Sequence, residues 1–522
     1  MDGILDAAAY FFHQGTNYRA YEYMGAHQTD CGDRVFRVWA PNALSVSLVG
    51  DFCNWHTGIP MDRIDVGGIW QCTVDSGVSA FGDKYKYKIM GCDGVSRYKT
   101  DPYACFAESL PNGASIICDE LSYNWRDDGF MSYRRSKAGI MNTQPLNIYR
   151  LSPARWNACV GGWSSLAREL APYVKQMGYT HIELEGVNEV SLLYTTVVCM
   201  GAPQELMAFV DSMHEAGVGV IIDLCTSDGF EEEYGIRLFD GQPLYEKSEG
   251  VESFDFGRNE VECFLISNAH YWLEWFHIDG LRLCKTDPTL SLEAEGFFRK
   301  LTAHIKADFP DALVMCDQKS RGLKFDFKLS SSTDTDAENY VLSSPAPSND
   351  ISGTRAELGY FMTRQGKKLW EMGTEIGVRT DGAIDWSVLG LEDRARLQLY
   401  SANLGQLYLS TPALWQNENR TAGKIYGDPQ NEAICFVRAD ADGEEIVVIV
   451  NLTSVGNDKY RVGVPTAGTY REIFNSDDQL YGGSGYLNFG DITSQMRSWH
   501  NRENSILVRI APKSIAVLQR IK

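Results

Sequence analysis

An alternation of predicted strands and helices in the central part of the chain constrains the fold most strongly. Short apolar runs of strand character are followed by longer segments of helical periodicity, and Gly178 and Gly217 end two of these helices. This alternation predicts a parallel sheet with helical crossovers, here a (β/α)8 barrel. The predicted strands are 146–149, 181–184, 218–223 and 276–285, and the predicted helices are 166–177, 202–216 and 260–276.

The predicted strand 276–285 contains a charge that needs a partner. Its apolar residues indicate a buried strand, and Gly280 permits a close backbone approach. Arg282 lies inside this apolar run, and a guanidinium can be neither deprotonated nor buried without a partner. We therefore expect Arg282 to face an acid or a polar pocket, and Asp223, at the end of the strand 218–223, is a candidate partner.

Runs of short strands flank the central region on both sides. Between about residues 30 and 120, alternating segments such as 35–39 and 84–89 are separated by turn residues, which predicts an N-terminal antiparallel β-sandwich of immunoglobulin-like type. From about residue 420 the strands return, and Asp442-Gly443 has the form of a hairpin turn, which predicts a C-terminal all-β sandwich. We place the domains at 1–125, 126–415 and 416–522.

The composition argues against several classes of binding partner. The 522 residues carry a formal net charge of −21 with a pI near 4.9, which argues against nucleic acid or an anionic membrane as the ligand. The 13 cysteines are odd in number and lack C-x-x-C spacing, so we expect reduced thiols and neither a disulfide framework nor a metal site. The N-terminus has no signal-peptide pattern, and no apolar run is long enough to span a bilayer, so we expect a cytoplasmic protein without a cofactor.

Many segments resemble the glycogen branching enzymes of the α-amylase superfamily. Asp279-Gly280-Leu281-Arg282 resembles the start of that family's motif on the fourth barrel strand. The resemblance implies a glycogen-binding-type β-sandwich, an α-amylase-type barrel and a C-terminal all-β domain, with an α-glucan such as glycogen as the ligand. The other matching segments, which together cover almost the whole chain, include 36–43, 50–55, 99–104, 173–184, 256–261, 366–377 and 470–477.

The resemblance also assigns the catalytic positions, and most of them are degenerate here. Retaining glycosidases need two carboxylates about 5 Å apart, one as nucleophile and one as acid/base. The nucleophile position is Cys284, the acid/base position is Asp317, and the position of a third carboxylate, which grips the sugar, is Pro345. Asp223 and Arg282 are retained. We therefore expect a degenerate, shortened barrel in which no residue is assigned as catalytic.

Several of these residues have a structural interpretation beside the functional one. The simpler interpretation of Cys284 is a small buried thiol that fills space. A cysteine has a pKa of about 8.5 unless a cation or a helix amino terminus lowers it, so an ordinary cysteine is mostly protonated and a weak nucleophile. Asp317 is one methylene shorter than the family's glutamate, which retracts its oxygens by about 1.5 Å. Two loops of the catalytic face are also reduced, after residue 184 and after Cys284. Trp55 and Lys86 are candidate glucan-binding residues, although for Trp55 packing against the neighbouring domain is the favoured interpretation.

We predict a branching-enzyme-like protein of glycogen metabolism that is a catalytically inactive pseudoenzyme. Its expected partner is an α-glucan or an active branching enzyme homologue, and we expect it to bind neither nucleic acid nor a membrane. Two alternatives stay open, an active 1,4-α-glucan branching transferase with an atypical site and a purely structural subunit. A branching assay on amylose separates the active enzyme from the other two classes.

Overall fold

The structure is a computed structural model that describes most of the chain. Its contacts define two compact units, the first made of residues 1–138, 159–169 and 184–325 and the second of residues 139–158, 170–183 and 326–522. No helix among the described residues combines the length and the apolar character needed to cross a membrane. The described residues are 7–109, 112–118, 122–157, 161–189, 192–225, 233–251, 253–284, 291–316, 325–330, 340–379, 382–416, 426–428 and 433–521.

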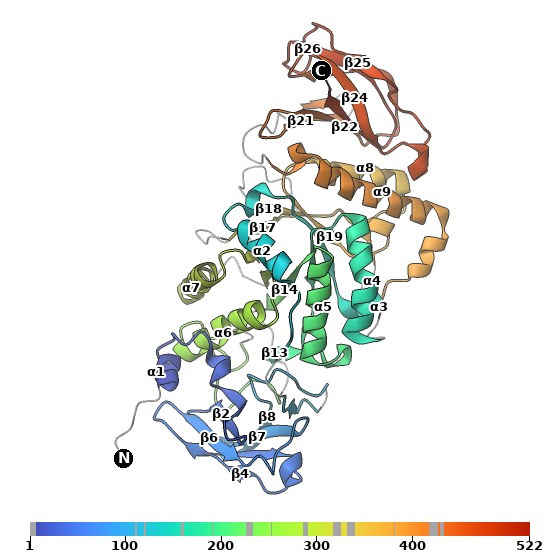
Figure 1. Ribbon diagram of the computed structural model, residues 1–522. Helices are drawn as coiled ribbons and strands as arrows, with labels where there is room; N and C mark the ends of the chain where they lie inside the picture. Colours follow the sequence, from blue (N-terminus) through green and yellow to red (C-terminus); the bar gives the residue numbers. More distant parts are fainter. Residues whose placement is uncertain are drawn as a thin grey trace. The chain divides into compact units, whose positions relative to one another are not determined.

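The N-terminal module of the first unit is a β-sandwich of short antiparallel strands (Figure 1). Its strands are β1 Gly25–Gln28, β2 Arg34–Trp39, β3 Ser45–Gly50, β4 Ile59–Pro60, β5 Asp62–Arg63, β6 Ile69–Val74, β7 Lys84–Met90, β8 Ser96–Lys99 and β9 Ser115–Ile116. One sheet has the order β1-β2-β6-β5, and the other has the order β4-β3-β7-β8 with β9 paired to β7. In β7 the side chains of Tyr85, Tyr87 and Ile89 are buried and the residues between them are half-buried, as the alternation predicted.

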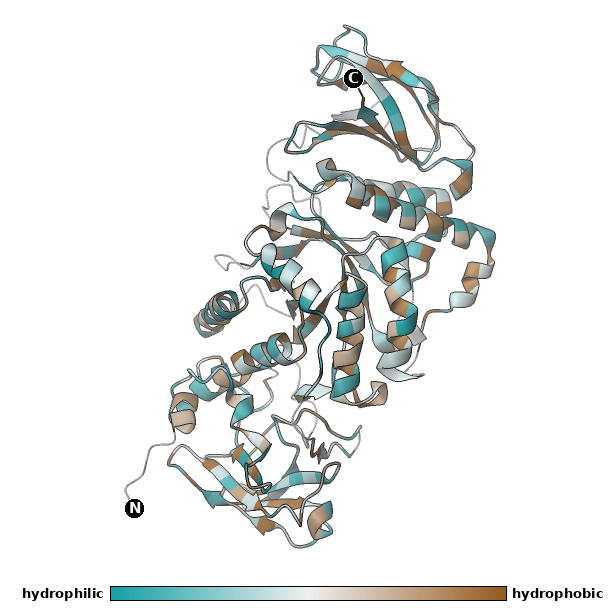
Figure 2. Cartoon of the chain, viewed as in Figure 1, coloured by the Kyte–Doolittle hydropathy of each residue, from teal (hydrophilic) through white to brown (hydrophobic). Residues whose placement is uncertain are grey.

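The central region forms a closed barrel of parallel strands, which confirms the predicted fold class. In barrel order the strands are β10 Asn147–Leu151, β11 His181–Leu184, β14 Gly219–Cys225, β15 Gly280–Cys284, β16 Leu313–Cys316, β17 Phe327–Ser330, β18 Tyr340–Ser343 and β19 Lys367–Glu371. The longer helices of the region are α4 Gly162–Met177, α5 Pro203–Glu215, α6 Asn259–Trp275, α7 Leu292–Asp308, α8 Ile351–Thr363 and α9 Glu392–Ser410. In Figure 2 these helices carry both hydrophilic and hydrophobic colours, as expected for helices that lay one face on a core.

The segment between α6 and β15 is a turn. α6 ends at Trp275, and β15 begins only at Gly280. Between them His277 adopts a left-handed backbone conformation with a φ of 50°. A glycine opens the strand because a Cβ at Gly280 would lie 2.8 Å from the Cβ of Leu313 on the neighbouring strand. The prediction of one strand over 276–285 is therefore wrong at its amino end, where the chain turns sharply to enter the barrel.

The second unit contains the C-terminal all-β domain. Its strands are β20 Tyr426–Asp428, β21 Ala433–Ala439, β22 Glu445–Asn451, β23 Asn457–Val464, β24 Thr469–Asn475, β25 Asp491–Thr493, β26 Asn504–Ile510 and β27 Ser514–Arg520. Six of them form a sheet in the order β20-β21-β22-β27-β24-β25, and β23 pairs with β26. Val447, Tyr460 and Leu518 belong to one core shared by these sheets. The predicted turn at Asp442-Gly443 joins β21 to β22, with a φ of 85° at the glycine.

Candidate functional site

The carboxyl ends of β14 and β15 bring together the two charged residues that the family-like motif retains. The strand register pairs Asp223 with Arg282. Their side chains are 10 % and 8 % exposed, and Nη1 of Arg282 lies 3.9 Å from Oδ1 of Asp223. This is an ion pair that is too long for a hydrogen bond. It agrees with the expectation that Arg282 faces an acid, because a buried guanidinium requires an anionic neighbour.

Cys284 lies at the end of β15, at the position of the family's nucleophile. Its side chain is 6 % exposed. The thiol donates to the carbonyl oxygen of Arg282, with 3.7 Å between Sγ and the oxygen. Only a protonated thiol donates a hydrogen bond, so this contact favours the neutral form over the thiolate that nucleophilic attack requires. If the predicted assignment of Cys284 to the nucleophile position holds, a thiol stands where a retaining reaction needs a carboxylate.

The acid/base position lies outside the described residues. β16 is described as far as Cys316, which is fully buried, and Asp317 follows it directly. The segments 226–232 and 285–290, which follow β14 and β15, lie outside the described residues as well. The role of Asp317 therefore stays a prediction from the sequence.

Pro345, at the position of the third carboxylate, follows β18 in the second unit. It is half-buried, and a proline has neither a backbone N–H nor a polar side chain with which to hold a sugar hydroxyl. The preceding Ser344 donates its amide to the carbonyl oxygen of Leu369 over 2.7 Å, and its hydroxyl accepts from the amide of Glu371 over 3.1 Å. These hydrogen bonds tie the end of β18 to β19, which is a scaffold role.

Trp55 and Lys86 of the N-terminal module differ in the solvent exposure and the hydrogen bonds of their side chains. Trp55 is 36 % exposed, and its indole N–H donates to the Asp51 carboxylate over 2.8 Å. The interpretation that Trp55 packs against the neighbouring domain stays a prediction. Lys86 is half-buried, its ammonium donates to the carbonyl oxygen of Asn112, and burial lowers the pKa of Lys86. Trp55 therefore presents an aromatic face to solvent, whereas Lys86 is engaged within the module.

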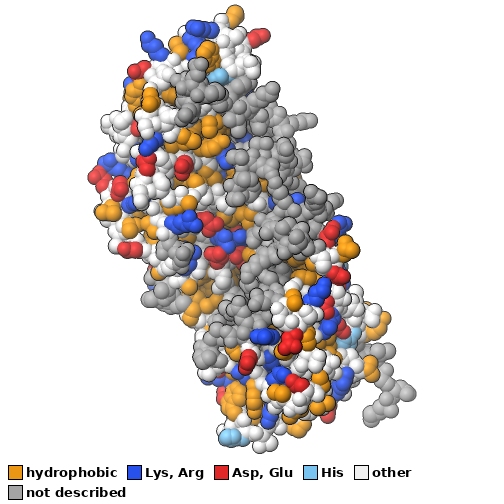
Figure 3. All heavy atoms as spheres, turned by 180° about the vertical axis from the view of Figure 1, so that it is seen from behind, with side chains coloured by type: hydrophobic (Ala, Val, Ile, Leu, Met, Phe, Trp, Pro, Cys, Tyr) orange, Lys and Arg blue, Asp and Glu red, His pale blue; other side chains and the backbone are white. Residues whose placement is uncertain are grey.

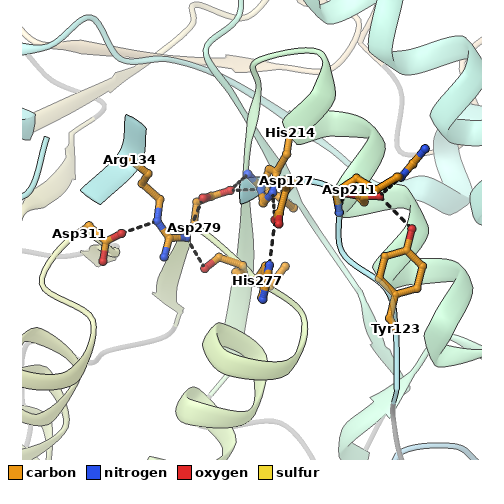
Figure 4. Close-up of polar contacts among 11 residues, drawn as sticks. Tyr123, Asp127, Arg134, Asp211, His214, His277, Asp279 and Asp311 are labelled. Atoms are coloured by element: carbon orange, nitrogen blue, oxygen red, sulfur yellow. Dashed lines mark hydrogen bonds and ion pairs between the residues drawn. The ribbon is translucent and has the colours of Figure 1, made fainter. Parts of the chain in front are cut away.

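A buried carboxylate stands at the opposite, amino-terminal end of β15 (Figure 4). Asp279 directly precedes the strand and is 1 % exposed. Its Oδ1 accepts from Nη1 of Arg134 over 2.8 Å. Its Oδ2 accepts from Nε2 of His214 over 2.9 Å and from the amide of Val220 over 2.6 Å. Both oxygens of the carboxylate are therefore hydrogen-bonded inside the protein, and Asp279 fixes the turn that leads into β15.

His214 links this carboxylate to a second one. Its Nδ1 donates to the carboxylate of Asp127 over 2.7 Å. Burial opposes the charge of His214, but the carboxylates of Asp279 and Asp127 outweigh that cost and raise the pKa of His214 to about 9. Burial likewise raises the pKa of Asp279, but the cations of His214 and Arg134 prevail and hold it well below its usual range. Arg134 also donates to Asp311 over 2.7 Å, so charges of both signs alternate through the network.

Sequence reasoning missed this network apart from Asp279, which belongs to the family-like motif. Arg134 comes from α2, Asp128–Ser136, and His214 from α5. These two partners lie 145 and 65 residues from Asp279 along the chain. One sequence feature could have pointed to the network. His214 lies in the last turn of α5, and the other buried residues of this helix are mostly apolar.

The flanking regions match two known families. The family described as Carbohydrate-binding module 48 (Isoamylase N-terminal domain) matches residues 23–104. The family described as Alpha amylase, C-terminal all-beta domain matches residues 426–521. Both matches fall on the β-sandwich regions seen in the structure.

Curated relatives match nearly the whole chain. The 1,4-alpha-glucan branching enzyme GlgB of Oceanobacillus iheyensis is 31 % identical, with 98 % of this chain and 97 % of the relative covered. The enzyme of the same name from Halothermothrix orenii is 32 % identical, with 97 % of each chain covered. The chain belongs to the 1,4-alpha-glucan branching enzyme family. The alignment with the first relative runs over 623 residues, 101 more than the 522 of this branching enzyme homologue, so the relative contains segments without a counterpart here.

Solved structures share the fold of this branching enzyme homologue. A putative alpha amylase from Salmonella typhimurium has a TM-score of 0.69 at 15 % identity and covers 93 % of this chain and 99 % of its own. A pullulanase from Anoxybacillus sp. LM18-11, solved with maltotetraose, has a TM-score of 0.71 at 15 % identity and covers 96 % of this chain and 87 % of its own. At such identity the likeness shows the fold alone, an α-amylase-type barrel between two β-sandwich regions.

Proposed function

We propose that this branching enzyme homologue is a catalytically silent protein that binds α-glucan. The observation that carries the proposal is the end of β15, where the 6 % exposed Cys284 donates its proton to a backbone carbonyl oxygen. A retaining transfer requires a carboxylate nucleophile at this position and a second carboxyl as acid/base. Pro345 adds a second loss, because its side chain cannot hydrogen-bond the sugar hydroxyls that stabilise the transition state.

Catalysis of this kind depends on a group of residues that act together. Nucleophile, acid/base and third carboxylate surround one oxocarbenium-like transition state, and the effects of removing them are grossly non-additive. Removing the nucleophile alone costs on the order of 10⁶ in rate in a well-studied triad enzyme. The segments that the longer relative carries without a counterpart here support the same conclusion, because segments that contact the substrate position the glucan for reaction.

We assign glucan binding to the N-terminal module. Trp55 is 36 % exposed there, and an exposed indole offers an apolar face on which a sugar ring stacks. On the face of this module drawn in Figure 3, acidic and basic side chains are interleaved. Such a surface suits a neutral polymer better than a polyanion. Membership of the branching enzyme family supports an α-glucan as that polymer.

A branching assay on amylose tests the catalytic part of the proposal. The purified chain and the relative from Oceanobacillus iheyensis are compared at equal concentration by the loss of iodine absorbance and by the NMR signal of new α-1,6 linkages. We expect turnover at least about 10⁴-fold below the relative, because at least one carboxylate of the catalytic group is absent. Turnover within about tenfold of the relative would establish the active transferase instead.

Co-sedimentation with glycogen tests the binding part. We expect the wild-type chain to sediment with glycogen and the Trp55→Ala variant to bind about tenfold more weakly, since loss of one stacking platform costs about 1–2 kcal/mol. The matched control is Trp499→Ala, which removes a 40 % exposed tryptophan from the C-terminal domain and leaves binding unchanged. A wild-type chain that stays in the supernatant would favour the structural subunit, and co-purification of an active branching enzyme from native lysate would identify a protein partner.

A further inference from the structure

A cavity in the first unit contains two thiols side by side. The cavity has a volume of about 110 Å³ and is lined by Cys105 and Cys118 together with aromatic side chains that include Tyr103 and Tyr271. Both cysteines are partly exposed and neither is in a disulfide. The Cys118 thiol interacts with that of Cys105 and, together with burial, raises the pKa of Cys105. Because both thiols line the same small cavity, we infer that a change of side-chain rotamers brings them to bonding distance.

The backbone holds the two cysteines at the base of one hairpin. Ala107 and Ser115 form an antiparallel bridge. The amide of Ile116 donates to the carbonyl oxygen of Phe106 over 2.9 Å. In this antiparallel register Cys105 lies across from residue 117, so Cys118 is one residue further along the facing segment. Cysteines in such adjacent positions are near the range of about 4.4–6.8 Å between Cα atoms that a disulfide spans.

The cavity also provides access for a small polar reagent. The hydroxyl groups of Tyr103 and Tyr271 line it, are buried, and form no hydrogen bond with any described residue. Buried hydroxyls without a protein partner are normally hydrated. A cavity that can hold a few water molecules also admits hydrogen peroxide, which resembles water in size and polarity.

We propose that Cys105 and Cys118 are a redox modification site that closes to a disulfide when the protein meets a peroxide. The Cys118 thiolate attacks one peroxide oxygen, the O–O bond breaks, and hydroxide leaves and takes up the thiol proton as water. Cys105 then attacks the sulfur of the resulting sulfenic acid, the S–S bond forms, and a second water leaves with the Cys105 proton. Two thiols are oxidised and one peroxide is reduced to two waters, and a dithiol reductant reverses the change.

The order of attack is assigned from the surroundings of Cys105. The neighbouring Cys118 thiol and burial raise the pKa of Cys105, which favours its neutral form, so we assign the first attack to Cys118. The resulting disulfide closes a loop from Cys105 to Cys118. That loop contains Asn112, whose carbonyl oxygen accepts the hydrogen bond from Lys86. The disulfide therefore restricts the motion of the segment 105–118, which contacts Lys86.

Peptide mapping of the full chain tests the proposal. The protein is treated with hydrogen peroxide, blocked with N-ethylmaleimide, digested without reduction and examined by mass spectrometry. We expect a peptide pair joined through Cys105 and Cys118, about 2 Da lighter than the two free peptides because two hydrogens are lost. Dithiothreitol should release both peptides and restore their labelling. Peroxide-treated protein in which both thiols still take up N-ethylmaleimide would overturn the proposal.

Two variants sharpen the result. Cys118→Ser should abolish the joined pair and leave Cys105 open to N-ethylmaleimide. Cys31→Ser, which removes an exposed cysteine of the same module, should leave the joined pair unchanged. A pair that forms between Cys105 and another cysteine in Cys118→Ser would also overturn the proposal. Mapping of the wild-type chain decides the question even where Cys118→Ser fails to fold.

Discussion

The two ends of strand β15 differ in what they do for this protein. At the amino end, Asp279 is 1 % exposed and both of its carboxylate oxygens are hydrogen-bonded to groups of other segments. At the carboxyl end, Cys284 is 6 % exposed and donates to the carbonyl oxygen of its own strand. The residue that flanks the amino end is a carboxylate bound to two cations, whereas the residue that ends the strand is a thiol.

This difference separates what the fold requires from what the reaction requires. Removing one member of a buried charge network leaves the others uncompensated, which costs several kcal/mol. A thiol in place of a carboxylate leaves no charge behind and has no such cost. We therefore expect the fold to tolerate a change at Cys284 far better than a change at Asp279.

The largest effect is expected at the amino end. Asp279→Asn keeps the size of the side chain but leaves His214 and Arg134 without their shared anion, and we expect it to destabilise the fold by about 3–5 kcal/mol. Urea unfolding followed by fluorescence measures the change in the midpoint. The matched control is Asp385→Asn at an exposed helix N-cap, which accepts from the Ser387 amide over 3.0 Å, and we expect almost no change in stability because the asparagine side-chain oxygen caps the same amide. Equal losses in the two variants would contradict the assigned role of Asp279.

The same network predicts a dependence of stability on alkaline pH. The pKa of His214 is about 9 in the folded state and about 6.5 in the unfolded state, so its contribution is fully present below pH 6.5 and is lost as the pH rises through 9. The loss amounts to about 3 kcal/mol.

Unfolding of the wild type and of His214→Gln between pH 6 and 10 isolates this contribution. We expect the stability of the wild type to fall toward that of the variant as the pH rises, because other titrating groups act equally in both proteins. A stability difference that stays constant across this range would mean that His214 does not carry a proton in the folded state.

A smaller effect is expected when a carboxylate is restored at the other end. Cys284→Asp places an anion in a nearly closed site, and we expect it to cost about 1–3 kcal/mol because Arg282, two residues away on the same strand, compensates only part of the desolvation. We expect no branching of amylose by this variant, since Pro345 and the shortened loops are unchanged. Turnover by Cys284→Asp but not by the wild type would show that one residue silences the site.

The smallest effect is expected for Cys284→Ala. The change removes one buried sulfur atom and its weak hydrogen bond, and we expect a loss of about 1 kcal/mol or less. Urea unfolding beside Asp279→Asn gives the contrast between the two ends of β15 in a single experiment. A cost comparable with that of Asp279→Asn would mean that the carboxyl end of the strand is as indispensable to the fold as the amino end.

The sequence by itself determined the architecture, and it predicts the degenerate positions of the site. The period of apolar residues sets secondary structure locally, so the strand–helix alternation predicted the barrel and the alternation in 84–89 predicted the buried face of β7. The identities of Cys284 and Pro345 follow from matching motifs, because a motif keeps its chemistry in a few adjacent residues. The domain boundaries at 125 and 415 and the role of Asp317 stay predictions.

The tertiary structure alone decided which charges meet. Asp279 finds His214 and Arg134 across 65 and 145 residues of chain, and no local pattern reports such a contact. It also decided that β15 begins at Gly280, because the limit there is the approach of Leu313 from another strand. Cys105 and Cys118 are two scattered cysteines in the sequence, and only the folded hairpin brings them to the same cavity. In each case the interaction joins residues that are far apart in the sequence and close in space, and local sequence patterns do not report such proximity.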